Sequence, residues 1–187
     1  MSGFIVCRFP VANRGSAPES FLTELVTWAK SAPTEVFEVK PGNDIYTEVA
    51  NQLGPYPEGD MLLRKAVMLE ILRVLAGFES SWSWTEGVDT TNSNSNKACT
   101  MEAGAFQCSG DSMNFDPSLK SLVREVAGTV ECIKFQEVTK TNHPFAIEYC
   151  ARLLRFTTKH HGPIKDHEIH EWLNRNAVME FETALKA

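Results

Sequence analysis

The sequence predicts a mainly α-helical protein that folds as a single domain over residues 1–187. A chain of 187 residues suits one domain and can bury a substantial core of its own. Several stretches carry apolar residues at the spacing of an amphipathic helix, whereas no regular set of alternating strands can be traced. The strand content that we expect is a short β-hairpin after Trp82.

Polar residues and prolines mark the starts of several predicted helices. Asp60 is a candidate N-cap, Asp116-Pro117 opens a later helix, and Asp166 is expected to cap the last one. The stretch 61–78 is apolar nearly all round, so we expect this helix at the buried centre of the domain. The predicted helical stretches are 19–30, 44–53, 61–78, 117–126, 144–159 and 167–185.

Charge and hydropathy exclude two classes of protein. The 18 basic and 24 acidic residues give a net charge of −6, and no basic cluster offsets it, so we expect no nucleic-acid partner. No apolar run approaches the ~20 residues of a membrane helix, so we expect no membrane span. The apolar run Phe4–Cys7 is too short for a secretory signal. The chain as given is expected to be cytoplasmic, already processed, or exported by a route that reads no signal peptide.

The five cysteines match no zinc motif, because the sequence holds no C-x-x-C pair. Two interpretations stay open: buried free thiols, or disulfides formed in an oxidising compartment. Proximity in sequence would pair Cys99 with Cys108 and Cys132 with Cys150, leaving Cys7 free.

We expect no metal and no cofactor. The run Asn-x-Asn-x-Asn at 92–96 resembles the start of a calcium loop, but Lys97 stands where such a loop needs glycine. The His-Glu-Ile-His run at 167–170 has two residues between its histidines, whereas the zincin motif has three. His160 and His161 are expected on the surface or near a helix C-terminus.

The carboxylate of Glu79 lies where the buried helix is expected to end, in the run Phe78-Glu79-Ser80-Ser81-Trp82-Ser83-Trp84. Aromatic neighbours exclude water and a helix C-terminus carries partial negative charge, and both favour the protonated form of a carboxyl group. A protonated carboxyl group is what a general acid needs to protonate a glycosidic oxygen. Trp82 and Trp84 are candidates for stacking on a sugar, and their alternation suggests that one of them faces the core.

A second polar segment follows about twenty residues later, in the run Thr100–Gln107. Its small residues would let a ligand approach the backbone, and Gln107 offers both donors and an acceptor to a sugar. Glycoside cleavage usually needs a second carboxylate, and Glu102 and Asp89 are available for that role.

These two segments carry a resemblance to a known family. With Glu79-Ser80 at the end of a buried helix and Ala103-Gly104-Ala105-Phe106-Gln107 after a polar loop, the sequence resembles the lysozyme-like superfamily, in particular goose-type lysozymes and lytic transglycosylases. The resemblance covers roughly Met61–Met113, with the catalytic core at about 60–160. More narrowly, the chain resembles the small muramidase effectors that bacteria deliver by type VI secretion into a rival's periplasm, and a phage endolysin also fits.

The resemblance implies a lysozyme-like (α+β) domain that hydrolyses the β-1,4 bond between N-acetylmuramic acid and N-acetylglucosamine in peptidoglycan. Glu79 would be the general acid. Glu102 ahead of Asp89, or else Asp111, would orient water or stabilise positive charge on the sugar. Glu102 stands where related transglycosylases usually have a small residue, which favours hydrolysis.

The same resemblance implies partners and a place of action. Gln107, Ser80, Trp82 and Trp84 would contact the glycan strand. An antibacterial toxin of this kind would harm its owner, so a cognate immunity protein is expected to occlude the cleft. The protein would be made in the cytoplasm and act in the periplasm of a target bacterium.

Other functions remain open at this point. A lytic transglycosylase would use the same acid without water, and a chitin- or chitosan-cleaving enzyme on a related fold is also possible. A non-enzymatic glycan- or protein-binding domain, in which Glu79 is structural, is the alternative of a different class.

Overall fold

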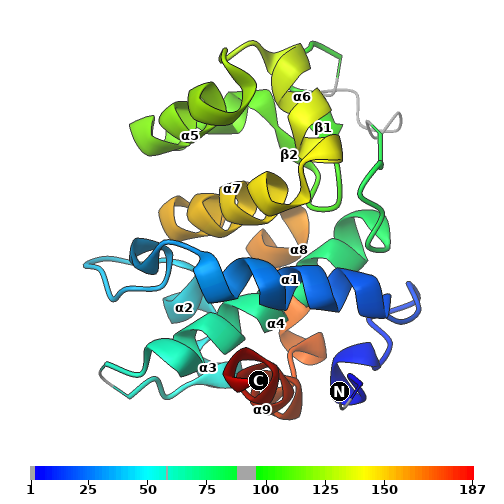
Figure 1. The fold of residues 1–187 in the computed structure, drawn as a ribbon, viewed down its shortest axis with the longest axis vertical. Coiled ribbons are helices and arrows are strands. Elements are labelled where there is room, and N and C mark those ends of the chain that lie inside the picture. The colour runs from blue at the N-terminus through cyan, green and yellow to red at the C-terminus, as the bar shows by residue number, and fades with distance from the viewer. Residues whose placement is uncertain (1–2, 58, 88–95) are drawn as a thin grey trace.

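The computed structural model describes residues 3–57, 59–87 and 96–187 (Figure 1). The described chain is mainly helical with one two-stranded antiparallel sheet, which confirms the predicted mainly α class and its short hairpin. No described helix is both long enough and apolar enough to cross a membrane. The elements are η1 (Val6–Arg8), α1 (Glu19–Ser31), η2 (Thr34–Val36), α2 (Ile45–Glu48), α3 (Ala50–Leu53), α4 (Met61–Ser80), β1 (Glu102–Ala103), β2 (Cys108–Ser109), η3 (Gly110–Phe115), α5 (Pro117–Ala127), α6 (Cys132–Thr141), α7 (His143–Phe156), α8 (Gly162–Lys165), η4 (Glu168–Trp172) and α9 (Arg175–Lys186).

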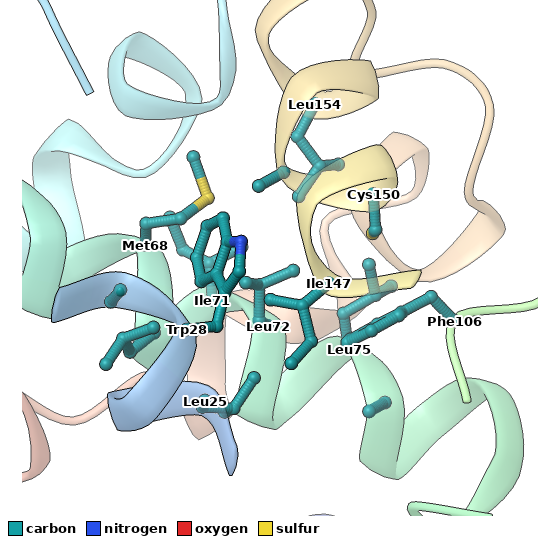
Figure 2. Close-up of a cluster of buried hydrophobic side chains, with 14 of the residues drawn as sticks. Leu25, Trp28, Met68, Ile71, Leu72, Leu75, Phe106, Ile147, Cys150 and Leu154 are labelled. Carbon is teal, nitrogen blue, oxygen red and sulfur yellow. The ribbon is translucent and has the colours of Figure 1, made fainter. Parts of the chain in front are cut away.

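Helix α4 is the centre of the fold, as predicted. Every residue from Ala66 to Gly77 is buried, and α1, α7 and α9 pack around the helix. Asp60 caps its first turn by accepting a hydrogen bond from the amide of Leu63 at 2.9 Å. Figure 2 shows apolar side chains of α1, α4 and α7 meeting in one cluster, which contains Leu25, Trp28, Met68, Ile71, Leu72, Leu75, Ile147 and Leu154.

A buried ion pair lies inside this apolar helix. The guanidinium of Arg73 binds both carboxylate oxygens of Glu70, with each N–O distance at 2.7 Å. Glu70 also accepts from the amide of Asn174, and Arg73 donates to the carbonyls of Phe9 and Trp172. The pair thus satisfies backbone groups of two segments that pack on α4. Removing one partner of such a pair typically costs about 3–5 kcal/mol, because the other charge stays buried.

Three predicted elements differ from the structure. The stretch 44–53 forms two short helices, α2 and α3, that meet at Val49. The last stretch is divided into η4 and α9, and Asp166 caps neither of them, because it is the residue after α8 and Asn174 caps α9. Helix α6 has no counterpart among the predicted helices. One reason is that its buried face combines Phe135 with the polar Thr139, whereas the apolar Ile133 is 67% exposed, so the helix has no regular apolar stripe.

The disulfide differs from the pairs that proximity in sequence suggested. Cys99 is bonded to Cys132, with the two Cα atoms 4.9 Å apart, and so the pairs Cys99–Cys108 and Cys132–Cys150 are wrong. The segment before β1 runs beside α6, where Gln136 donates to the carbonyl of Ala98. Cys7, Cys108 and Cys150 are buried free thiols.

The N-terminal segment is tied to the last helix by Glu180 of α9. Its carboxylate accepts hydrogen bonds from the amides of Ile5, Val6 and Cys7, at 2.8, 3.3 and 2.8 Å. Burial alone would raise the pKa of Glu180, but the amide donors of Cys7, Ile5 and Val6 outweigh it and lower the pKa.

Glycine usually weakens a helix, but at Gly77 the packing leaves no room for a side chain. A Cβ atom at this position would lie 2.8 Å from Cζ2 of Trp82 and 3.2 Å from Val11. We therefore expect Gly77→Ala to lower the free energy of unfolding by about 1–3 kcal/mol in a urea titration. Gly162→Ala is the matched control, since nothing lies within 4 Å of its added Cβ. A Gly77→Ala protein as stable as this control would contradict the packing described.

The stabilising effect of Glu180 is expected to depend on pH. Because its pKa is lower in the folded than in the unfolded protein, its contribution is present at neutral pH and is lost as the pH falls through the folded value. Glu180→Gln should lower the free energy of unfolding by about 1–2 kcal/mol at pH 7, a value reduced by partial solvation of the carboxylate. The difference from wild type should shrink below about pH 4.

Glu182→Gln removes the same charge from the same helix and is the control for that experiment. Chemical denaturation of the three proteins at several pH values gives the comparison. A deficit of Glu180→Gln that stays constant down to pH 3, or that Glu182→Gln shares, would contradict the role given to Glu180.

Candidate functional site

Glu79 is positioned by the way in which α4 ends. Ser81 adopts a left-handed conformation, with φ of 53°, and its amide donates to the carbonyl of Gly77. The amide of Trp82 donates to the carbonyl of Ala76, so a second carbonyl near the end of the helix is also satisfied. Glu79 therefore lies in the last turn of a buried helix, with its side chain 16% exposed.

Ser80 joins this helix end to the β-hairpin. Its hydroxyl donates to the carbonyl of Ala105 at 2.8 Å and accepts from the amide of Ser83 at 3.1 Å. Ala105 lies in the turn between β1 and β2, so the hairpin turn is fixed directly beside Glu79. Ser80 was expected to contact the glycan, whereas its hydroxyl makes hydrogen bonds within the protein.

The partner of Glu79 is His161, the residue before α8. The Nδ1 atom of His161 lies 3.2 Å from Oε1 of Glu79. On the other side of the ring, Nε2 lies 4.0 Å from Sγ of Cys108 and 4.0 Å from Sγ of Cys150. The expectation of a surface or helix-capping residue was wrong for His161, whose exposed fraction is 3%. The fold closes over it because α7 and α8 bring it back onto the end of α4.

These neighbours determine the charges in the cluster. Burial alone would lower the pKa of His161, but Cys108 and Glu79 outweigh it and raise the pKa to about 10. A hydrogen bond with Cys150, aided by His161, lowers the pKa of Cys108 to about 6 against the effect of burial. Burial raises the pKa of Cys150, so this thiol stays protonated. At neutral pH the ring of His161 is thus an imidazolium next to the thiolate of Cys108.

The depth of each group below the protein surface limits the chemistry that the cluster can perform. A carboxylate, an imidazole and a thiol in a row resemble the triad of a cysteine hydrolase. In this protein the thiols are the innermost groups, since Cys108 is 1% and Cys150 0% exposed, and the carboxylate of Glu79 is the outermost. A substrate would therefore meet Glu79 first, and the sulfur atoms are badly placed as nucleophiles.

Glu102 lies in strand β1, whereas Gln107 lies in the turn of the hairpin. Ala103 pairs with Cys108 and Glu102 with Ser109. Because directly paired residues share a face of the ladder, Glu102 lies on the side opposite to Cys108. Gln107 has a φ of 46°, is buried, and donates from Nε2 to the carbonyl of Gly104 at 2.9 Å. Part of its amide is therefore used to shape the turn.

Asp111 shares the region of Glu102. The hydroxyl of Ser109, the partner of Glu102 in the ladder, donates to Oδ1 of Asp111 at 2.5 Å. This contact places a second candidate carboxylate next to the hairpin face that carries Glu102 and Ser109. Asp89, like the calcium-like run up to residue 95, lies outside the described residues.

The two tryptophans occupy different environments. Trp82 is 5% exposed, and its Nε1 donates to the carbonyl of Arg73 at 2.8 Å, so it is a core residue with no free face for a sugar. Trp84 is half-buried and stacks on His143, with ring centroids 4.2 Å apart and an interplanar angle of 10°. It also packs on Phe21, which ties it to α1.

Two groups of described residues could hold a metal ion. Cys108, Cys150 and His161 bring their ligand atoms within 4.8 Å of one another and are all buried. Glu48, His167 and His170 form the other group, in which His167 is 62% exposed and makes an ion pair of 2.7 Å with Glu48. The first group was missed in the sequence because 53 and 11 residues separate His161 from Cys108 and Cys150.

A groove elsewhere on the molecule is unrelated to these residues. It has a volume of about 540 Å³ and is lined mainly by α5 and α7, including Leu122, Glu125, Phe145 and Arg152. None of the described residues that line it belongs to the site around Glu79.

Comparisons with known proteins add no assignment to this geometry. No family model, no curated protein and no solved structure matches the chain.

Proposed function

We propose that the chain is a lysozyme-like muramidase that hydrolyses the β-1,4 bond between N-acetylmuramic acid and N-acetylglucosamine in peptidoglycan. The observation that carries this proposal is the solvent-facing carboxylate of Glu79, held in the last turn of a buried helix against a hairpin turn. A rigidly held carboxyl group beside a turn of small residues has the placement that a general acid for a glycosidic bond requires.

His161 supports this role by orienting the carboxyl group. Its Nδ1 contacts Oε1 of Glu79. The other oxygen, Oε2, would therefore carry the proton that passes to the glycosidic oxygen. On the other side of the ring, Nε2 lies 4.0 Å from Sγ of Cys108, so both ring nitrogens have a partner and the ring is held in place.

The remaining roles follow the same proposal. Of the two tryptophans, Trp84 is the proposed sugar contact through the exposed part of its ring, because Trp82 is buried and one face of Trp84 already stacks on His143. Glu102 is proposed to orient the attacking water although it lies on the hairpin face opposite to Cys108, and Asp89 and Asp111 are the alternatives. The proposed place of action is the periplasm of a target bacterium, reached by type VI secretion. A cognate immunity protein that covers Glu79 is the proposed partner in the producing cell.

Loss of the acid should abolish turnover. Glu79→Gln keeps the shape of the side chain but provides no acidic proton, so we expect lysis of purified peptidoglycan to fall by about 10²–10⁴-fold. Circular dichroism should show an unchanged fold, and Glu182→Gln, a carboxylate lost from α9, should retain wild-type activity. Near wild-type lysis by Glu79→Gln would refute the assignment, and absence of lysis by the wild type in a zymogram would favour a binding domain.

The second carboxylate is tested by its effect on the chemical step. Glu102→Gln should lower kcat strongly with little change in KM, because it acts on water rather than on the bound sugar. Asp89→Asn should have a smaller effect. We expect the carboxyl groups of Glu79 and Glu102 to lie about 6.5–9.5 Å apart, the separation of an inverting hydrolase.

Product analysis separates hydrolysis from its closest alternative. Mass spectrometry of the digested glycan should find reducing ends, whereas anhydro ends would identify a lytic transglycosylase. A fully active Glu102→Gln enzyme that forms reducing ends would transfer the role to Asp89 or Asp111.

A further inference from the structure

Three soft ligand atoms converge beneath Glu79. They are Sγ of Cys108 on β2, Sγ of Cys150 on α7 and Nε2 of His161, and all lie within 4.8 Å of one another. The three residues are 1%, 0% and 3% exposed. In Figure 2, Cys150 lies among apolar side chains that include Phe106 and Leu154. Two thiols and an imidazole on three different elements, closed off from water, form a built site rather than a chance surface cluster.

The spacing fits three of the four ligand positions around a tetrahedral metal ion. With Zn–S bonds of about 2.3 Å and Zn–N bonds of about 2.0–2.1 Å, tetrahedral angles place nitrogen and sulfur about 3.6 Å apart. The imidazole nitrogen is 4.0 Å from each of the two sulfurs, so a shift of a few tenths of an ångström would bring these atoms to that separation.

The neighbour of His161 completes the pattern. A histidine that binds a metal usually donates its other ring N–H to a carboxylate, which fixes the tautomer and the orientation of the ring. Here Nδ1 of His161 contacts Glu79, and so Nε2 is the nitrogen that faces the two sulfur atoms. Thiolate and imidazole ligands together favour Zn²⁺ over Mg²⁺ or Ca²⁺.

We propose that Cys108, Cys150 and His161 bind one Zn²⁺ ion, with Glu79 as the outer partner of the histidine ligand. The site would join the hairpin, α7 and the residue before α8 directly under the carboxylate of Glu79. Glu79 thus has a positioning contact to the metal site that is independent of any reaction. The inference does not rest on muramidase activity, because metal binding is measured on the protein alone.

The test uses the full chain, purified under anaerobic conditions without reductant so that the disulfide stays closed. A thiol count of three, for Cys7, Cys108 and Cys150, establishes the starting state. Titration with Co²⁺ should then give one equivalent per chain and a thiolate-to-cobalt charge-transfer band, and Zn²⁺ should abolish this band by displacement. The wild-type spectrum tests the proposal even if a variant fails to fold.

Variants assign the ligands. Cys108→Ser and Cys150→Ser should each lose most of the charge-transfer band, whereas Cys7→Ser, which removes the third buried thiol, should behave like wild type. Glu79→Gln should still bind one equivalent but about 10–100-fold more weakly, as expected for an outer partner of a ligand.

Three results would overturn the proposal. The first is a wild-type protein that gives no charge-transfer band with Co²⁺. The second is a thiol count of one, with peptide mapping that finds a Cys108–Cys150 disulfide. The third is a Cys7→Ser protein that loses the band to the same extent as Cys108→Ser.

Discussion

The ion pair between Glu70 and Arg73 is the interaction on which the rest of the structure depends. A helix buried on every side needs apolar neighbours, yet the backbone of those neighbours brings polar groups that must be satisfied. The pair supplies partners to Phe9, Trp172 and Asn174, and so it lets an N-terminal segment and the start of α9 close over α4. Burying two charges in an apolar helix costs desolvation energy. This cost is offset because the two charges are opposite and lie in direct contact.

The C-terminal end of α4 is also held in place by packing. Trp82 follows the last turn, is held by the carbonyl of Arg73 and leans on Gly77, so the chain leaves α4 in one fixed direction. Ser81 and Trp82 both have positive φ values, which non-glycine residues adopt at some cost in energy. The packing of the indole offsets that cost, and Glu79 lies between the buried helix α4 and the hairpin turn that is bonded to Ser80.

Local signals in the sequence were sufficient for part of this picture. Apolar residues on all sides of the stretch 61–78 predicted the buried helix α4. Asp60 and Asp116 cap the helices that they were expected to cap. The place of Glu79 at the helix end followed from the same pattern. Contacts between distant segments could not be read in this way. Cys99 lies closer in sequence to Cys108 than to Cys132, but the chain path past α6 selects the more distant partner. His161 carries no local sign of burial, because α7 and α8 must be placed before its neighbours are known.

Glu180 has a consequence for how the protein can be handled or joined to others. Since its carboxylate holds the amides of residues 5–7, the two ends of the described chain lie together, and Figure 1 shows both at the pole opposite to β1 and β2. A fusion partner or an affinity tag attached at either end would emerge far from the hairpin. A carrier protein joined at either terminus would therefore leave the hairpin uncovered.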